Sequence, residues 1–341
     1  MKSMKNIFRF LSIGLAVLLN SCNKRDLDVN ISSVKLPLNF YNLDSIEFNT
    51  ENAAFLKSQI LKGDYRHDEI ISYQFNYCLS VGRVSDDSTF HHLKMFTGDP
   101  YFQRVNKAVQ QQLYPNLPKY NSQISDGFKR LKYHNSGFKF PESVIYINSA
   151  FSSSVFSTEH EIGVSLERYL SDSVKVIQEL PADPFYDWVK KKFNRKFLVR
   201  DVLLGWITTH IVSVDNGNLA EKMIQHGKAL YLLKAALPKE KDALILRYDD
   251  VQYRWARENE WNFWDFLVKQ KLLYTTNERD QSNFLNDGPY TMGLPETGPD
   301  RMGQFLGLQM IISYLDEHPK TTLKELIKLP YTEIIKEYKV E

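Results

Sequence analysis

The chain has 341 residues, with 43 lysines and arginines against 41 aspartates and glutamates, and 43% of its residues are hydrophobic. This composition is that of a globular protein, and it excludes a disordered, collagen-like or low-complexity chain. The formal net charge of +2 gives no electrostatic reason to expect a nucleic-acid partner.

The amino terminus has the layout of a secretory signal. Three basic residues, Lys2, Lys5 and Arg9, precede a mostly apolar stretch over residues 10–19. As a helix this stretch would rise about 15 Å, roughly half of what a span of the hydrocarbon core requires. Residues 1–21 are therefore predicted to be a cleaved signal peptide and not a transmembrane anchor.

Residues 18–22, Leu-Leu-Asn-Ser-Cys, resemble a bacterial lipobox. The resemblance implies that Cys22 becomes the lipidated first residue of the mature chain, and two or more acyl chains anchor a protein stably to a membrane. A plain secretory signal followed by a chance cysteine is the alternative. The other cysteine, Cys78, lies in an apolar and aromatic stretch and is predicted to be a buried hydrophobe. The segment after Cys22 has no dense acidic run, which favours a periplasm-facing position on the outer membrane.

The elements that follow the anchor are predicted in chain order. Residues 22–50 have little periodicity and are predicted to form the lipidated cysteine, a tether and an extended segment. The pattern to about residue 134 is helical: Asp99 is placed to cap a helix over residues 101–113 with Pro100 at its first position, and a second helix covers 120–132. Two β-branched or alternating runs, residues 143–148 and 162–166, predict two or three strands of a small sheet.

The remainder of the chain has helical periodicity. A helix is expected to start at Asp183-Pro184 and run through Phe193, with Asp183 as its cap. Further helices are predicted over residues 199–212, 219–237, 248–273 and 301–316, and short turns over 323–338. The fold class is therefore predicted as α+β and predominantly α-helical, with a small β-sheet around residues 140–170. Residues 51–341 are expected to form a single domain.

Metal and nucleophile motifs are sparse in this sequence. His160-Glu161 begins a His-Glu-x-x-His pattern, but Val164 stands where the second histidine of a zinc-binding helix is required, and the segment is predicted to be a strand. The eight histidines include no pair three to five residues apart, and His91-His92 are predicted to lie in a solvated loop. No phosphate loop or nucleophile elbow occurs. The sequence therefore predicts no metal and no cofactor.

Two glycines lie inside a predicted helix, where glycine is unfavourable. Gly303 and Gly307 lie four residues apart on one face of the helix predicted over 301–316, although glycine costs about 1 kcal/mol relative to alanine inside a helix. Close packing of a second helix is the first interpretation. A binding cleft flanked by Arg301 and Gln304 is the second.

The carboxy-terminal half resembles the gliding-motility lipoprotein GldB family of Bacteroidota, most closely over residues 140–318. The resemblance rests on an ordered series of stretches: VIYI at 144–147, GVSLERYL at 163–170, MIQHGKALY at 223–231, LYTT at 273–276, GPYT at 288–291, GPDRMG at 298–303 and GLQ at 307–309. That family is in turn similar to predicted zinc peptidases with a helical fold. Their His-Glu-x-x-His helix would fall on residues 200–211, which lack the motif, and their third ligand would fall where His226 stands. The resemblance thus implies a zincin-like helical bundle without its metal site.

The resemblance implies a role in surface gliding and in the type IX secretion machinery linked to it. The leading hypothesis is a non-catalytic, membrane-tethered accessory protein whose degenerate cleft, walled by residues 200–211, 219–237 and the Gly303/Gly307 helix, binds an envelope protein. The candidate cleft residues are His210, His226, Arg301, Gly303 and Gly307. One rival is an envelope hydrolase that uses His210, His226 and a carboxylate from residues 242–260. Another is a purely structural envelope lipoprotein.

Overall fold

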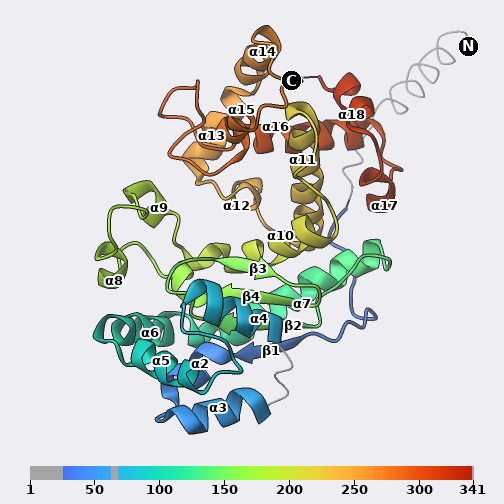
Figure 1. The fold of residues 1–341 in the computed structure, drawn as a ribbon. Helices are drawn as coiled ribbons and strands as arrows, with labels where there is room; N and C mark the ends of the chain where they lie inside the picture. Colours follow the sequence, from blue (N-terminus) through green and yellow to red (C-terminus); the bar gives the residue numbers. More distant parts are fainter. Residues whose placement is uncertain (1–25, 63–67, 340–341) are drawn as a thin grey trace, which may run out of the picture.

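A computed structural model describes residues 26–62 and 68–339, and it is a predominantly helical α+β protein (Figure 1). A small sheet and the helices around it form one end of the molecule. The helices from α11 onward form the other end. The predicted fold class is therefore confirmed.

The sheet has four strands in the order β1-β2-β4-β3. Strands β1 (Asn39–Asn42), β2 (Ser143–Ile147) and β4 (Glu161–Ser165) are parallel, and β3 (Val155–Ser157) pairs antiparallel with β4. The predicted runs at 143–148 and 162–166 are thus confirmed as strands. The register sets Asn39 beside Ser143 and Ser143 beside Glu161. The carboxyl ends of three parallel strands therefore meet at one edge of the sheet.

Both faces of β2 are buried, as is usual where helices cover a parallel sheet. Val144 and Tyr146 pack into the larger of two apolar clusters, which extends into the carboxy-terminal helices. Ile145 and Ile147 point the other way, into a smaller cluster formed with the amino-terminal helices. The sheet is therefore the layer that joins the two halves of the core.

The amino-terminal helices pack around β1 and β2. They are α2 (Leu43–Asn49), α3 (Ala53–Lys62), α4 (Asp68–Tyr73), a π-helical turn (Gln74–Cys78), α5 (Asp87–Gly98), α6 (Pro100–Gln112), a 3-10 turn (Tyr114–Asn116) and α7 (Leu117–His134). The predicted cap of α6 is confirmed, since the side chain of Asp99 accepts hydrogen bonds from the backbone N–H groups of Tyr101 and Phe102 at 2.8 and 3.2 Å.

Two expectations about this half differ from the structure. In the range predicted to be a tether and an extended segment, β1 fits the extended segment, but the helix α2 was not expected, and its Asp44 and Glu47 have no exposed surface. Folding of this range depends on pairing with β2, about a hundred residues later, which local periodicity does not report. His91 and His92, expected in a loop, lie within α5 and are both exposed, whereas the buried positions of this helix include Phe90 and Leu93.

Between the sheet and the carboxy-terminal helices lie a 3-10 turn (Leu166–Tyr169), α8 (Lys175–Gln178), α9 (Asp187–Lys191), a second 3-10 turn (Arg195–Phe197) and α10 (Leu198–His210). The helix expected from Asp183-Pro184 is wrong at its start. That peptide bond is cis, α9 begins only at Asp187, and Tyr186 precedes it in an extended conformation. Asp-Pro is also typical of turns, and the turn is what forms here.

The carboxy-terminal helices are α11 (Leu219–Ala236), α12 (Asp242–Leu246), α13 (Asp250–Glu258), α14 (Glu260–Lys269), α15 (Glu278–Leu285), α16 (Met302–Glu317), α17 (Leu323–Leu326) and α18 (Tyr331–Glu337). The predictions for α11 and α16 are confirmed to within a residue or two. The helix expected over 248–273 is two helices, because the chain breaks at Asn259, which ends α13 and precedes α14.

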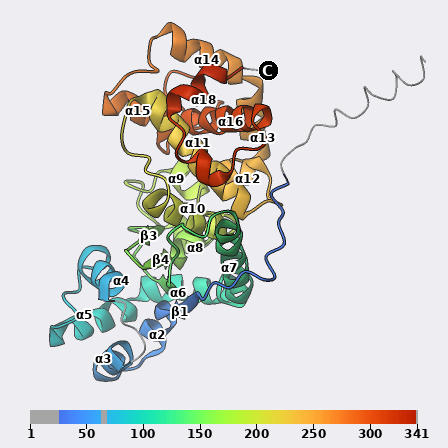
Figure 2. The same cartoon turned by 90° about the vertical axis from the view of Figure 1, so that its right-hand side faces the viewer.

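Residues 26–38 run along the outside of the molecule from the carboxy-terminal helices to β1 (Figure 2). Asp28 pairs with Lys239 at 3.3 Å, and Lys132 of α7 donates to the carbonyl of Lys35 at 2.9 Å. Leu27 is 7% exposed and belongs to the larger apolar cluster. Over residues 26–62 and 68–339, no helix combines the length and apolar character that crossing a membrane needs.

Candidate functional site

The glycine pair of α16 lies where this helix meets α11. A Cβ atom added to Gly307 would lie 1.8 Å from the carbonyl oxygen of Met223, and one added to Gly227 would lie 2.2 Å from the carbonyl oxygen of Gly307. A Cβ on Gly303 would meet the carbonyl oxygen of Phe284 at 2.9 Å. The backbones are therefore in direct contact, and close helix packing is the reason for these glycines.

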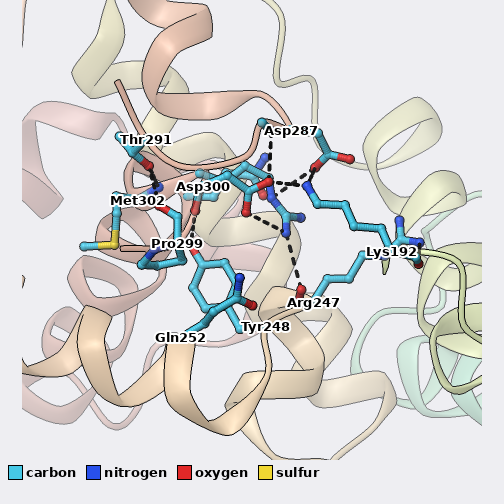
Figure 3. A network of polar contacts seen from close by, with 12 residues as sticks. Lys192, Arg247, Tyr248, Gln252, Asp287, Thr291, Pro299, Asp300 and Met302 are labelled. Atoms are coloured by element: carbon cyan, nitrogen blue, oxygen red, sulfur yellow. Dashed lines mark hydrogen bonds and ion pairs between the residues drawn. The ribbon is translucent and has the colours of Figure 1, made fainter. Parts of the chain in front are cut away.

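Arg301 lies at the start of α16 and is 5% exposed. Its backbone is left-handed, with φ of 54°, so the chain turns sharply from the preceding loop into the helix. Its Nε lies 3.1 Å from Oδ1 of Asp287, and its Nη2 lies 3.2 Å from Oδ1 of Asp300 (Figure 3). One guanidinium thus bridges two carboxylates of the loop between α15 and α16.

Lys192, which follows α9, completes this cluster. Its Nζ pairs with Oδ2 of Asp300 and lies 3.5 Å from Oδ1 of Asp287. Burial opposes ionisation of Asp287, but the charges of Arg301 and Lys192 outweigh burial and hold its pKa well below the usual range. Burial likewise acts against the charged form of Arg301, yet Asp287 and Asp300 raise its pKa above the ordinary value. Asp287 and Arg301 are therefore charged together at neutral pH.

Hydrogen bonds hold the same loop from the other side (Figure 3). The Tyr248 hydroxyl donates to the carbonyl of Asp300, and the backbone N–H of Gly288 donates to Asp300 Oδ2 at 3.0 Å. The Thr291 hydroxyl donates to Pro299 at 2.9 Å and accepts from the N–H of Met302 at 3.1 Å. These hydrogen bonds join the beginning of the loop, at Gly288 and Thr291, to its end at residues 299–302.

A second layer of charge connects this cluster to α10 and α12. Arg247 donates to the carbonyl of Lys192 at 3.0 Å and lies 3.4 Å from Oδ2 of Asp201. Arg200 donates to Oδ1 of Asp201 at 2.8 Å and to the carbonyl of Ile245 at 3.0 Å. We call Lys192, Arg200, Asp201, Arg247, Asp287, Asp300 and Arg301 the arginine network. It links α9, α10, α12 and the loop before α16, and its charges are paired with one another.

Sequence reasoning singled out Arg301 but missed its partners. Asp300 adjoins it within the GPDRMG stretch, so that part of the pairing could have been found. Lys192 and Arg247 are far from Arg301 in sequence, and no spacing rule connects them. The structure shows Arg301 buried and paired with Asp287 and Asp300.

The two candidate histidines are held by different elements. Nε2 of His210 donates to the carbonyl of Thr158 at 2.8 Å, and its ring stacks on Trp206 with centroids 3.8 Å apart. Burial lowers the pKa of His226 to about 4, an effect that Asp215 opposes and Arg301 reinforces. His226 is therefore neutral at pH 7. His210 is tied to the segment after β3.

Three of the carboxylates of residues 242–260, from which the hydrolase hypothesis requires one, have other partners. Asp242 pairs with Lys234, Asp249 caps α13 through the N–H of Gln252 at 2.8 Å, and Glu260 pairs with Arg257 at 2.7 Å. Asp215 and not one of these carboxylates is the acid that acts on His226. Among the described residues, no group of three or more His, Cys, Asp or Glu side chains is placed to hold a metal ion.

A cavity of about 470 Å³ does border the predicted cleft helices, at their carboxy-terminal halves. Tyr231 of α11 and Gln309 of α16 line it, together with Arg257, Tyr338 and Leu27. Arg257 donates to Gln309 at 2.7 Å, and the Tyr338 hydroxyl donates to Glu260 at 2.7 Å. None of the five candidate cleft residues is part of its lining.

These features define a helical α+β protein whose carboxy-terminal half is built on a glycine-mediated helix pair and a paired charge network. The model of the family described as gliding motility protein GldB matches residues 24–340. The chain belongs to this family, and the match extends to the first 140 residues, which the sequence resemblance covered only loosely. A comparison with curated proteins and one with solved structures each gave no match.

Membership implies a role in gliding motility and association with the cell envelope. Cys22 precedes both the matched range and the described residues, so its lipidation stays a prediction of the sequence.

Proposed function

We propose that this protein is a non-catalytic accessory component of the gliding and type IX secretion apparatus. It is anchored through a lipid on Cys22, on the periplasmic side of the outer membrane. The observation that carries the proposal is the match of the GldB family over residues 24–340, nearly the whole chain. The lipobox-like segment immediately before this range supplies the anchor.

The geometry of the carboxy-terminal half supports a binding role over catalysis. The helices of the proposed zincin-like layout, α10 and α11, carry His210 and His226, and each lies among different neighbours. Gly227, which follows His226, packs directly on the backbone of α16. These positions serve packing, so the proposed partner site is a surface and not the predicted cleft.

The position of Leu27 indicates which end of the protein would face the membrane. Leu27 packs into the core beside the cavity lined by Tyr231 and Tyr338, and it follows Cys22 by five positions. Five extended residues reach at most about 18 Å. A lipid on Cys22 would therefore hold the α11–α16–α18 end near the membrane and direct the sheet and helices α2–α6 away from it, where envelope proteins would be met.

The test is a deletion strain complemented with variants of the full chain. Extracellular and surface-displayed proteins are quantified together with colony spreading. Wild type is expected to restore both. Cys22→Ala is expected to restore neither, because the protein is no longer held at the membrane. Cys78→Ala is the matched control, since it removes the other cysteine without touching the anchor.

Normal secretion and spreading in the deletion strain would overturn the proposed role, and full rescue by Cys22→Ala would overturn the anchor. The non-catalytic character has its own test. Purified protein that carries stoichiometric zinc and cleaves peptides would exclude it.

A further inference from the structure

Three buried acidic residues gather at the edge where the parallel strands β1, β2 and β4 end. Asp44 and Glu47 lie on α2, directly after β1, and Glu167 lies in the 3-10 turn after β4. All three have no exposed surface. Helices α2 and α4 lie against this part of the sheet (Figure 1). The carboxyl edge of a parallel sheet is where ligands are commonly bound in α/β proteins.

Each acidic side chain is satisfied on one oxygen only. Oδ2 of Asp44 accepts hydrogen bonds from the Tyr114 hydroxyl at 2.7 Å and from Asn106 at 3.3 Å, while its Oδ1 has no hydrogen-bond partner among the described residues. The amide of Asn148, whose Nδ2 also lacks a partner, lies close enough to stabilise the Asp44 carboxylate. Oε2 of Glu47 accepts from the Gln74 amide at 2.9 Å, while its Oε1 has no partner in the described part of the chain. The arrangement fixes both carboxylates and leaves one acceptor of each free.

Gln74 supplies an independent observation at the same place. It is fully buried at the start of the π-helical turn, and π-helical turns are frequent at functional sites. Its Nε2 donates both to Glu47 and to the carbonyl of Asn148 at 3.0 Å, but its Oε1 has no partner within residues 26–62 and 68–339. A neutral amide oxygen cannot be satisfied by protonating it, so it needs a donor or a cation.

Glu167 is held differently. Its Oε1 accepts from the N–H and the hydroxyl of Ser149, both at 2.8 Å, and from the N–H of Phe151 at 3.0 Å. Among the described residues no three acidic, histidine or cysteine side chains are placed to bind one metal together. Glu167 therefore acts through its charge on a site made by the other two carboxylates.

We propose that Asp44, Glu47 and Gln74 form a binding site for one hard divalent cation, with Ca²⁺ preferred to Mg²⁺. Carboxylate and amide oxygens are the ligands such cations take. Two carboxylates balance the charge of a divalent ion, and Glu167 adds negative potential. Calcium tolerates irregularly placed oxygens and an interior of protein ligands, whereas magnesium demands octahedral geometry and retains several waters.

The proposal does not rest on the function proposed above. It accounts for a cost that the fold otherwise carries, since buried carboxylates are expected to be paired with cations or to bind metals. Among the polar groups that act on Asp44 and Glu47, the described residues offer Tyr114, Asn106, Asn148 and Gln74 but no lysine or arginine.

The experiment uses the full chain in chelator-treated buffer at pH 8, with thermal unfolding followed during titration with CaCl₂ or MgCl₂. Wild type is expected to melt about 4 °C higher at a Ca²⁺ concentration about a hundred times the Kd, with a smaller response to Mg²⁺. Terbium luminescence is a second readout, since Tyr114 adjoins Asp44 and can sensitise a bound Tb³⁺ ion that Ca²⁺ then displaces.

Glu47→Gln keeps the shape of the side chain and removes its charge, so it is expected to lose the Ca²⁺ response. Glu258→Gln, on the exposed face of α13, is the matched control and is expected to respond as wild type does. Equal responses in Glu47→Gln and wild type would overturn the site.

Asp44→Asn and the Tb³⁺ titration of wild type keep the test decisive if Glu47→Gln does not fold. A wild-type chain that responds to neither cation, and whose melting temperature rises only when the pH is lowered, would show that protons neutralise the cluster. That result would overturn the proposal. A response to Mg²⁺ equal to that to Ca²⁺ would overturn the stated preference.

Discussion

Two buried charged clusters in this protein follow opposite electrostatic rules. In the arginine network, carboxylates lie beside guanidinium and ammonium groups. Desolvation opposes ionisation of Asp287, whose side chain is 49% exposed, but Arg301 and Lys192 outweigh it and hold the pKa of Asp287 below its usual range. At the edge of the sheet, Asp44 lies among other acids, and burial together with Glu167 raises its pKa to about 7 against the hydrogen bond from Tyr114. The same residue type is therefore shifted in opposite directions.

The comparison shows that the neighbours, and not burial alone, decide which form of a buried acid is stable. Burial disfavours the charged form of Asp44, which has no exposed surface, whereas the side chain of Asp287 is 49% exposed and lies beside the cations of Arg301 and Lys192. A network of paired opposite charges fixes how elements pack, although its net contribution to stability can be small. An unsatisfied cluster of like charges requires a proton or a bound cation, and so makes the fold sensitive to its surroundings.

The largest effect is expected when the arginine network is broken at its centre. Arg301→Met leaves the buried carboxylate of Asp300 with one cation fewer, and loss of one partner from a buried ion pair typically costs about 3–5 kcal/mol. Arg301→Lys retains the charge and the left-handed backbone position but not the planar fork, so a smaller loss is expected. Urea unfolding at pH 7 measures both.

Arg104→Met is the matched control for this prediction. Arg104 pairs with Glu179 at 2.6 Å, but more than half of its side chain is exposed (53%), and exposed pairs contribute at most about 1 kcal/mol. If Arg301→Met were no more destabilising than Arg104→Met, the network would not be the paired and buried cluster described here.

The acidic cluster around Asp44 predicts that the folded protein loses stability as the pH rises. In metal-free buffer the folded chain holds a proton on Asp44 up to about pH 7, whereas the unfolded chain releases it near the ordinary pKa of 3.8. Stability from this group is therefore complete at low pH and is lost as the pH rises towards 7, by at most about 1.4 kcal/mol per pH unit. Glu47, Glu167 and Tyr114 face the same carboxylate, and burial raises the pKa of each of them too.

Asp44→Asn is expected to weaken this loss of stability between pH 5 and pH 7, because the amide cannot release a proton. Melting temperatures across that range, with chelator present, measure the slope, and the exposed Glu258→Gln variant should retain the wild-type slope. An unchanged slope in Asp44→Asn would mean that Asp44 titrates at its ordinary pKa and that the two clusters do not differ as described.

The sequence reveals these two clusters to different extents. Arg301 could be singled out because Gly303 and Gly307 follow it on a strongly apolar helix, and the structure confirms that the glycines serve helix packing. Asp44 and Glu47 could not, since they lie in a range without periodicity. Only the register that sets Asn39 beside Ser143 places them in the core.

The same distinction explains which elements were predicted. Strand β2 and helix α6 have signals within a few residues of themselves, a β-branched run in one and Asp99-Pro100 in the other. Strand β1 is recognisable only through its partner β2, and Lys192 becomes part of a site only because α9 and the loop before α16 meet in space. Local propensity predicts elements well, whereas sites that depend on distant pairing need the structure.

A smaller effect on the pH dependence of stability is expected at His226, which is not part of the arginine network but is affected by the charge of Arg301. Burial, with Arg301 and Lys222, lowers its pKa to about 4, against an ordinary value of 6.5. The unfolded chain therefore binds a proton in this window that the folded chain does not, and stability falls as the pH drops from 6.5 towards 4. His226→Gln is expected to flatten that fall, while His91→Gln, on the exposed face of α5, is expected to leave it unchanged.

Arg301→Lys and Arg301→Met then separate the contribution of charge from that of burial at His226. If the cation of residue 301 contributes as the network implies, the His226 pKa measured by NMR titration rises in Arg301→Met, because a positive charge that opposed protonation is gone. It stays near the wild-type value in Arg301→Lys. An identical His226 pKa in all three proteins would leave burial as the whole cause and would confine the electrostatic reach of the arginine network to the residues that it contacts.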